Sequence, residues 1–208
     1  SVKLEGEATV SHTDTRTREL TARQTFLQGG DSYGRIRHAS SAHDLYFNTN
    51  HNWTFNSKWV NVTLNPNLHY SSNSGSSLDR SVQSFSENLT DESLDTLFSP
   101  DVSPAKLAGI INRVSEESKR DGYYLSTGMT AQAAIKLPHT NDNFLIEARG
   151  NFVNTRHDNF AHKLYDYPQG GASADLRNEY GKEDYRSHSA TAKASYYYCG
   201  IGRNWLIS

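Results

Sequence analysis

The sequence predicts an all-β fold: an antiparallel, up-and-down transmembrane β-barrel fragment of about seven long strands. Three observations predict it: strands with one apolar and one polar face, strand lengths suited to a bilayer, and connections of alternating length. The clearest strand is segment 59–70, WVNVTLNPNLHY, with Val, Val, Leu, Pro, Leu and Tyr at even positions. Its odd positions are Trp, Asn, Thr, Asn, Asn and His. Because successive strand side chains point to opposite faces, this strand has an apolar face and an amide-rich face.

Strand length and recurrence support the same prediction. Segment 59–70 is roughly twice as long as an ordinary globular strand and close to the length that crosses a bilayer at a tilt. A lipid-facing wall around a wet lumen has this alternation. The alternation recurs in six further candidate strands, the last of them partial: 2–11, 44–55, 123–137, 144–152, 188–196 and 204–208.

The connections between these candidate strands alternate in length. Short turns are predicted at 56–58, 138–143 and 199–203, and long polar segments at 14–42, 72–121 and 156–184. Outer-membrane barrels place short turns on the periplasmic side and long loops on the extracellular side. Aromatic residues lie near the predicted strand ends, as interfacial girdles do: Trp53, Phe55, Trp59, Tyr70, Tyr123, Tyr124, Phe144, Tyr196, Tyr197, Tyr198 and Trp205.

Composition agrees with a barrel wall and excludes several other classes. The chain of 208 residues is 35% hydrophobic, with a mean hydropathy of −0.74, which is low for a compact globule. Aromatic residues make up 11%, too many for disorder, and a net charge of −2 predicts no nucleic-acid partner. No apolar run approaches the length of a transmembrane helix.

No catalytic, cofactor or metal site is predicted, and the chain is not expected to be an enzyme. The single cysteine, Cys199, has neither a disulfide partner nor a metal-spaced neighbour. The nine histidines show no ligand spacing such as an i,i+4 helical pair. Ser103 and Lys106 match the Ser-x-x-Lys pattern of acylating enzymes, but the companion motifs of those enzymes are missing.

One predicted loop contains a candidate helix. Ser103 followed by Pro104 is typical of an N-cap and first helical position. The following apolar residues have helical spacing and predict a helix of about fifteen residues; they are Leu107, Ile110, Ile111 and Val114. This stripe either packs on the barrel mouth or a neighbouring loop, or forms a docking surface for a surface lipoprotein or substrate. Upstream apolar residues available for packing are Leu89, Leu94, Leu97 and Phe98.

A second predicted loop, 156–184, contains a candidate ligand-contacting segment. Tyr165, Asp166 and Tyr167 place aromatic rings beside an acid, and binding residues concentrate on loops. Exposed turns of any barrel have a similar composition, so both interpretations stay open. The side chains predicted to face the lumen are mixed in charge and predict no ion path; they include Glu5, Glu7, Asn61, Asn65, Glu147, Arg149 and Lys193.

Several phrases of the sequence resemble a known family. They are Tyr70-Ser71-Ser72 after NLHY, the turn-flanked pairs at 52–70 and 133–152, and the ending YYYCGIGRNWLIS. The chain resembles part of the barrel domain of Bacteroidota outer-membrane proteins, the group of TonB-dependent receptors and the related outer-membrane β-barrel family. This resemblance implies residence in the outer membrane and TonB-dependent import of glycans, peptides or metal chelates.

The same resemblance implies partners for the chain. They are outer-membrane lipid, a plug domain, the TonB system and a surface lipoprotein, with no nucleic acid and no cofactor. Neither a plug domain nor a TonB-interaction segment has a counterpart here. Residues 1–208 are therefore interpreted as a partial barrel domain, and an unclosed, curved sheet with two bare edges is expected.

Three classes of function remain open from the sequence. The first is a nutrient-uptake receptor barrel. The second is an outer-membrane barrel without that role, such as an adhesin, an assembly factor or a porin-like channel, and the third is a soluble β-sandwich that binds a ligand. A membrane barrel predicts that Val62→Arg blocks insertion whereas Thr63→Arg is tolerated, because only the first side chain faces lipid.

Overall fold

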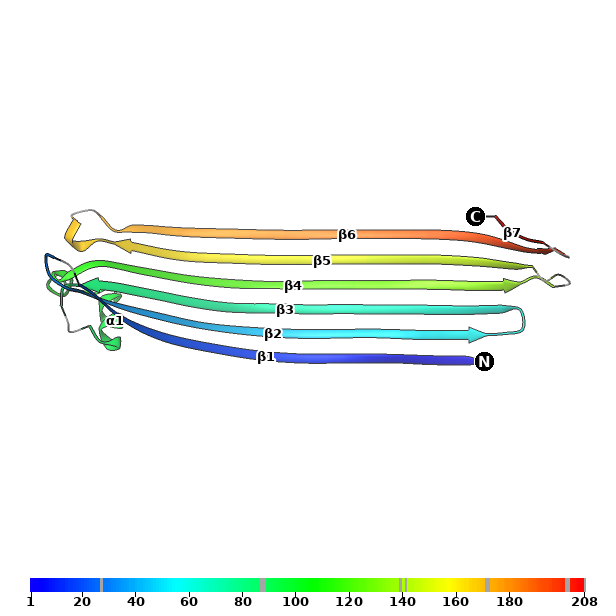
Figure 1. Cartoon of the computed structure of the whole chain (residues 1–208), viewed down its shortest axis with the longest axis horizontal. Helices are drawn as coiled ribbons and strands as arrows, with labels where there is room; N and C mark the ends of the chain where they lie inside the picture. Colours follow the sequence, from blue (N-terminus) through cyan, green and yellow to red (C-terminus); the bar gives the residue numbers. More distant parts are fainter. Residues whose placement is uncertain are drawn as a thin grey trace.

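Seven antiparallel strands form one sheet in which every strand pairs with its neighbours in the sequence (Figure 1). The strands are β1 (Val2–Thr25), β2 (Ser32–Asn56), β3 (Val60–Ser84), β4 (Ile110–Lys136), β5 (Asn143–Asp166), β6 (Asp175–Gly200) and β7 (Arg203–Ile207). The connections contain helices α1 (Asp91–Leu97) and α2 (Pro104–Leu107) and a short 3-10 turn, η1 (Pro168–Gly170). The all-β, up-and-down prediction is confirmed, and β1 and β7 are the two edge strands.

The structure is a computed structural model. It describes residues 1–26, 28–86, 89–138, 140, 142–170, 173–200 and 203–207. The predicted short turns are confirmed between β2 and β3 and between β4 and β5. The third predicted turn, 199–203, includes residues 201 and 202, which lie outside the described residues. The first turn is closed by Ser57, whose backbone N–H donates to the carbonyl oxygen of Val60 at 2.9 Å.

The strands are about twice as long as the sequence predicts. The six long strands contain 24 to 27 residues each, or roughly 80 Å at about 3.3 Å per residue. The predicted long loops 14–42, 72–121 and 156–184 are therefore wrong, because most of their residues belong to strands. Backbone pairing stabilises these segments whatever their side chains are, so polar runs without an apolar period continue the sheet. The pairing is with a strand on each side in the interior of the sheet, and with one strand for 14–25 of β1 and 175–184 of β6.

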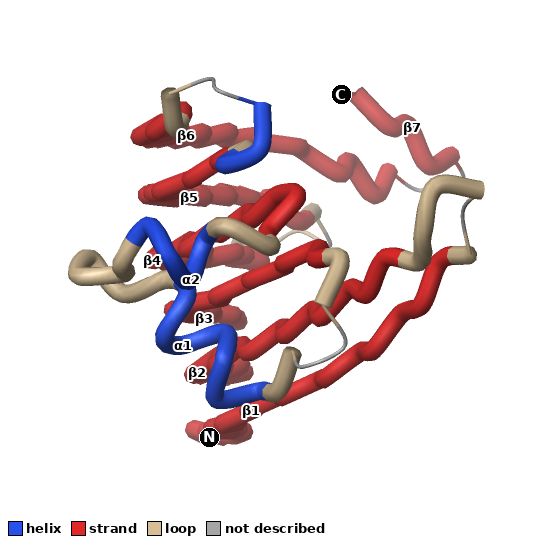
Figure 2. The backbone as a smooth tube through the Cα atoms, turned by 90° about the vertical axis from the view of Figure 1, so that its left-hand side faces the viewer, coloured by secondary structure: helices blue, strands red, loops and turns tan. Residues whose placement is uncertain are grey.

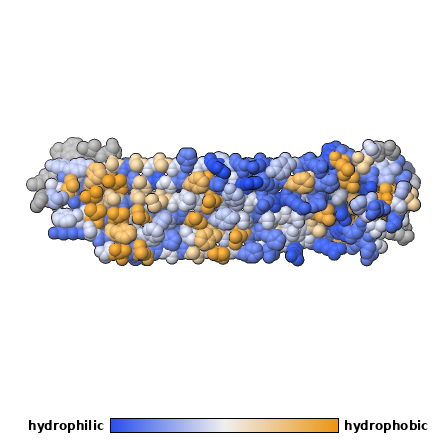
Figure 3. Space-filling model, turned by 180° about the vertical axis from the view of Figure 1, so that it is seen from behind, coloured by the Kyte–Doolittle hydropathy of each residue, from blue (hydrophilic) through white to orange (hydrophobic). Residues whose placement is uncertain are grey.

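The register places the apolar side of every strand on the same face of the sheet. Leu64 in β3 pairs with Trp53 in β2 and with Ala131 in β4, and Trp53 also pairs with Leu4 in β1. We call the apolar side chains in the half of this face nearer the short turns the apolar band (Figure 3). Its larger members are Val2, Leu4, Val10, Leu45, Phe47, Trp53, Phe55, Val60, Val62, Leu64, Leu68, Tyr70, Leu125, Met129, Ile135, Phe144, Ile146 and Phe152.

The apolar band ends in neighbouring register rows across the sheet. Val10 of β1 and Tyr70 of β3 both pair with Phe47 of β2. In β2 the band extends one same-face position farther, to Leu45, and in β5 it ends at Phe152, closer to the short turns. The band therefore crosses the strands with nearly level margins.

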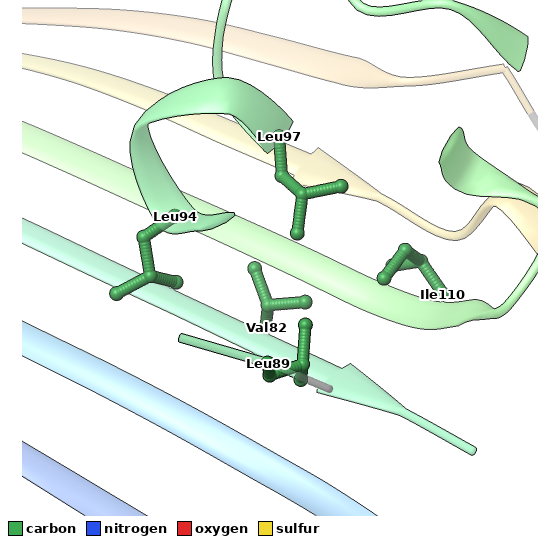
Figure 4. Close-up of a cluster of buried hydrophobic side chains, with 5 residues drawn as sticks. All are labelled: Val82, Leu89, Leu94, Leu97 and Ile110. Carbon is green, nitrogen blue, oxygen red and sulfur yellow. The ribbon is translucent and has the colours of Figure 1, made fainter. Parts of the chain in front are cut away.

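Among the described residues, no layer covers the apolar band, and the buried cluster lies at the opposite end of the strands. Leu94 and Leu97 project from α1 toward Val82 of β3 (Figure 4). Leu89 and Ile110 complete this cluster. Figure 2 shows α1 and α2 on one side of the sheet. Val82, which α1 covers, is an even-numbered residue of β3 like Leu64, so the helices lie on the face of the apolar band.

The predicted fifteen-residue helix is wrong in length. Ser103 is the N-cap and Pro104 the first helical residue, as predicted, but α2 has only 4 residues. Ile110, Ile111 and Val114 belong to β4 instead. β-branched residues such as Ile and Val favour strands. As part of β4, the segment also belongs to a strand that pairs with β3 and β5, whereas a helix in the connection would not form these hydrogen bonds between strands.

Candidate functional site

The face opposite the apolar band, which we call the polar face, is rich in amide side chains. Asn50 of β2 pairs with Asn67 of β3, and Asn67 pairs with Gly128 of β4. Gly128 in turn pairs with Asn151 of β5. The amides on this face include Asn48, Asn50, Asn52, Asn61, Asn65, Asn67, Gln132 and Asn151. The alternation seen in the sequence therefore becomes a continuous amide-lined surface across four strands.

Gly128 is required by the packing of these amides. A Cβ atom at this position would lie 2.7 Å from Asn67 Oδ1 and 3.2 Å from Asn151 Oδ1. Two amide side chains thus lean over the glycine from the strands on either side. The small residue lets the amides of β3 and β5 approach each other across β4.

Three rings lie together on the polar face beside the amides, and we call them the aromatic trio. Tyr46 of β2 and His69 of β3 have ring centroids 5.0 Å apart at an interplanar angle of 78°. His69 and Tyr124 of β4 are 5.3 Å apart at 74°. All three side chains are half-buried. Edge-to-face contact is a favourable aromatic arrangement, so the rings hold one another in place above the sheet.

Charged side chains border this area. Glu7 of the edge strand β1 accepts a hydrogen bond from Asn50 Nδ2 at 3.3 Å. Nearer the short turns, Glu147 accepts one from Gln132 Nε2 at 2.9 Å and faces Lys193 of β6. Acids and bases therefore lie at the margins of the amide-lined surface, as its mixed composition predicts.

The candidate ligand-contacting segment does not form one site. Tyr165 and Asp166 end β5 and point to opposite faces, while Tyr167 is 49% exposed in the connection. Asp166 is only 7% exposed and forms an ion pair with Arg113 Nε at 2.5 Å. Arg113 also donates to the carbonyl oxygen of Leu97. Asp166 therefore helps to anchor the helical connection.

The candidate docking helix has no free apolar stripe in this structure. Leu107 packs against the buried cluster, and Ile110 is a member of it. Ile111 lies at a register shift between β3 and β4, and Val114 pairs with Ser81 further along β4. The prediction that upstream leucines pack against this segment is confirmed for Leu107 and Ile110.

Ion pairs hold α1 on the sheet. Asp95 of α1 accepts hydrogen bonds from Arg37 Nη1 of β2 at 3.0 Å and from Arg80 Nη1 of β3 at 2.9 Å. The hydrogen bond from Arg37 lowers the pKa of Asp95 below its ordinary value of 3.8. A lowered folded-state pKa stabilises the docked helix above the unfolded pKa and stops doing so as the pH falls through the folded value.

We expect the docking of α1 to be insensitive to pH near neutrality and to weaken below about pH 4. Hydrogen exchange of the α1 amides in the intact protein, corrected for the intrinsic pH dependence of exchange, measures this. Asp95→Asn is the matched variant and should lose the pH dependence. Equal pH dependence in both proteins would show that Asp95 is not responsible.

Cross-strand histidine–aspartate pairs were not predicted from the sequence. Asp14 of β1 lies 2.5 Å from Nδ1 of His43 on β2 and 3.2 Å from Nε2 of His12 on its own strand. His38 Nδ1 and Asp79 Oδ1 are 2.5 Å apart. Sequence spacing contains no signal for such pairs, since only the register between strands brings them together. Among the described residues, no three His, Cys, Asp or Glu side chains are placed to hold a metal ion.

Comparisons with known proteins give no family. No family model matches the chain, and no curated protein matches it. A structure of the membrane pore complex of pneumolysin aligns with a TM-score of 0.21 and 8% identity, over 92% of this chain and 31% of that one. The ferric yersiniabactin uptake receptor FyuA from Yersinia pestis aligns with a TM-score of 0.23 and 10% identity, over 94% and 32%. The chain spans about a third of each of these structures.

Within the described residues, no helix has the length and the apolar content needed to cross a membrane.

Proposed function

We propose that this chain is part of the wall of an outer-membrane receptor barrel that imports nutrients by a TonB-dependent route. The observation that carries the proposal is the pairing of an apolar band on one face with an amide-lined surface on the other. Lipid-facing and lumen-facing side chains alternate in this way in transmembrane barrels. The TonB-dependent route itself rests on the family resemblance of the sequence.

The dimensions of the apolar band support a membrane wall. In β3 it runs from Val60 to Tyr70, which spans roughly 33 Å along the strand. At the tilt of about 35–45° that barrel strands have, this length corresponds to a height of roughly 25 Å, the height of the outward apolar band of outer-membrane barrels. The strands continue beyond the band on the side away from the short turns. On this proposal the sheet extends well above the membrane on the extracellular side.

Exposure of the band argues against a soluble sandwich. Val2, Leu4 and Val10 are 64%, 63% and 65% exposed, and Met129 in the middle of the sheet is 50% exposed. A sandwich would cover such residues with a second sheet, and the described residues contain no such layer. Lipid supplies the missing cover. In lipid the edges of β1 and β7 also need pairing partners, because unpaired backbone groups are costly there, so the proposal requires further strands.

The proposed partners follow from the barrel and from the resemblance. Outer-membrane lipid covers the apolar band, a plug domain lies against the polar face, and the TonB system supplies energy. A surface lipoprotein is a further partner that the resemblance implies. A porin-like channel is the second candidate, since its wall would also combine an apolar band with a hydrated, amide-lined face.

Uptake by cells tests the proposal. The full-length protein is expressed in a Gram-negative host with and without a functional TonB system, and accumulation of neutral oligosaccharides, peptides and ferric chelates is measured. We expect uptake of one of these classes that is lost without TonB. Uptake that persists without TonB would identify a channel instead, and an outer-membrane protein with no uptake at all would contradict the transport role.

A further inference from the structure

We infer that the aromatic trio and the amides beside it bind a neutral saccharide. This inference rests on the proposed function, because it names the class of solute that the polar face of the receptor wall contacts. The trio lies at the level where the apolar band ends on the other face: Tyr46 is followed by Phe47, and His69 by Tyr70. In the proposed barrel this is the lumen near the outer surface of the membrane.

The rings have the geometry of a platform. Tyr46 and Tyr124 flank His69 on the two neighbouring strands, and each makes an edge-to-face contact with it. Since the three rings come from three paired strands, the sheet itself fixes their positions. Sugar rings present C–H groups on their faces, and these pack on aromatic rings. The half-buried trio leaves ring surface available on the polar face.

The trio also has hydrogen-bonding groups to offer. Within the described part of the chain, the side chains of Tyr46, His69 and Tyr124 form ring contacts but no hydrogen bond. Asn48 and Asn67 lie beside His69 in the sheet. Amide side chains both donate and accept hydrogen bonds. A ligand with many hydroxyl groups matches this set of donors and acceptors.

Charge decides which class of solute fits. In the register rows occupied by and adjoining the trio, the polar face from β2 to β5 has no Lys or Arg side chain, and its one formally charged side chain is Asp44 of β2. These positions are Asp44, Tyr46, Asn48, Asn50, Asn67, His69, Ser71, Asn73, Gly122, Tyr124, Ser126, Gly128, Asn151, Val153, Thr155 and His157. An anionic peptide or an anionic metal chelate would find no cationic counter-ion there and would be repelled by Asp44. A carboxylate also accepts hydrogen bonds from hydroxyl groups, so the surface is complementary to an uncharged, polyhydroxylated molecule.

Adjacent tyrosines provide a matched pair of variants. Tyr124 belongs to the trio, whereas Tyr123 points to the opposite face, where its hydroxyl accepts a hydrogen bond from Asn154 Nδ2 at 3.1 Å. Both tyrosines are half-buried in the same strand, β4. Tyr124→Ala and Tyr123→Ala therefore remove the same side chain from opposite faces. Tyr124→Phe keeps the ring and removes only its hydroxyl.

Titration calorimetry on the full-length protein tests the inference. The probes are maltohexaose, xylohexaose and chitohexaose, with trigalacturonate as the anionic comparison, in a detergent without a sugar head group. We expect the wild type to bind at least one neutral probe more tightly than trigalacturonate. Tyr124→Ala should weaken this binding about tenfold, a loss of about 1.4 kcal/mol that lies within the range of an aromatic contact. Tyr123→Ala should bind as the wild type does, and Tyr124→Phe should retain most of the affinity.

Several results would overturn the inference. They are no binding of any neutral probe, tighter binding of trigalacturonate, or an equal loss of affinity in the two alanine variants. The proposed function fails separately, through uptake that does not need TonB or through no uptake at all. TonB-dependent uptake in a protein that binds no neutral saccharide would leave the receptor proposal intact and remove only the saccharide inference.

Discussion

Leu64→Arg is expected to prevent assembly of the full-length protein in the outer membrane. Leu64 lies near the middle of the apolar band in β3, between Trp53 and Ala131. An arginine facing lipid at the midplane of a barrel costs about 2–4 kcal/mol. Because β3 is paired on both sides, the arginine could reach the polar face only through a one-residue shift of register. Such a shift would move every side chain of β3 to the opposite face. Heat-modifiable migration of the outer-membrane fraction on gels measures the assembled protein.

Two control variants make this prediction specific to a membrane. Thr63→Arg places the same charge on the polar face, next to Thr54 and Gln132, and should assemble normally. Val60→Arg lies at the margin of the band, where the cost falls to about 0–1 kcal/mol, and should assemble at an intermediate level. Equal assembly of all three variants would show that the apolar band does not face lipid.

The sequence was sufficient to predict the face of each strand but not its length. In 59–70 the apolar period identifies the strand directly, and the register confirms that Val62 and Leu64 share a face with Trp53 and Phe55. Beyond Tyr70 the same strand continues as Ser71-Ser72-Asn73-Ser74-Gly75, a run without an apolar period. The ladders with β2 and β4 hold this run in the sheet, and no single-strand pattern reports a ladder between distant segments.

The candidate site shows the same division. Single-strand parity predicts that His69 and Asn67 share the polar face, and the structure places them there. It cannot predict that Tyr46 and Tyr124 lie beside His69, because that depends on the registers of β2 and β4 against β3. The predicted helix failed for a related reason. Over a few residues the spacing of Ile110, Ile111 and Val114 fits a helix and a strand equally well, and only pairing decides between them.

Leu94→Ala is expected to release the helical connection 85–109 from the sheet while leaving the strands intact. Leu94 is 0% exposed and packs in the buried cluster with Val82 and Leu97. Truncation of a buried leucine to alanine costs about 2–5 kcal/mol, and few other apolar contacts hold this connection. Alanine is a better helix former than leucine, so the loss reflects packing and not helix propensity. Limited proteolysis of the intact protein should show faster cleavage within 85–109.

The exposed face of the same helix supplies the control for this loss of packing. Thr96 is exposed and donates a hydrogen bond to the carbonyl oxygen of Glu92 within α1, so Thr96→Ala should leave the cleavage rate close to that of the wild type. Asp95 would still pair with Arg37 and Arg80 in Leu94→Ala. Faster cleavage despite these pairs would show that apolar packing dominates the docking. Unchanged cleavage in Leu94→Ala would mean that the ion pairs alone hold α1. Exposed ion pairs usually contribute less than about 1 kcal/mol each, so the two pairs of Asp95 would then have to act together.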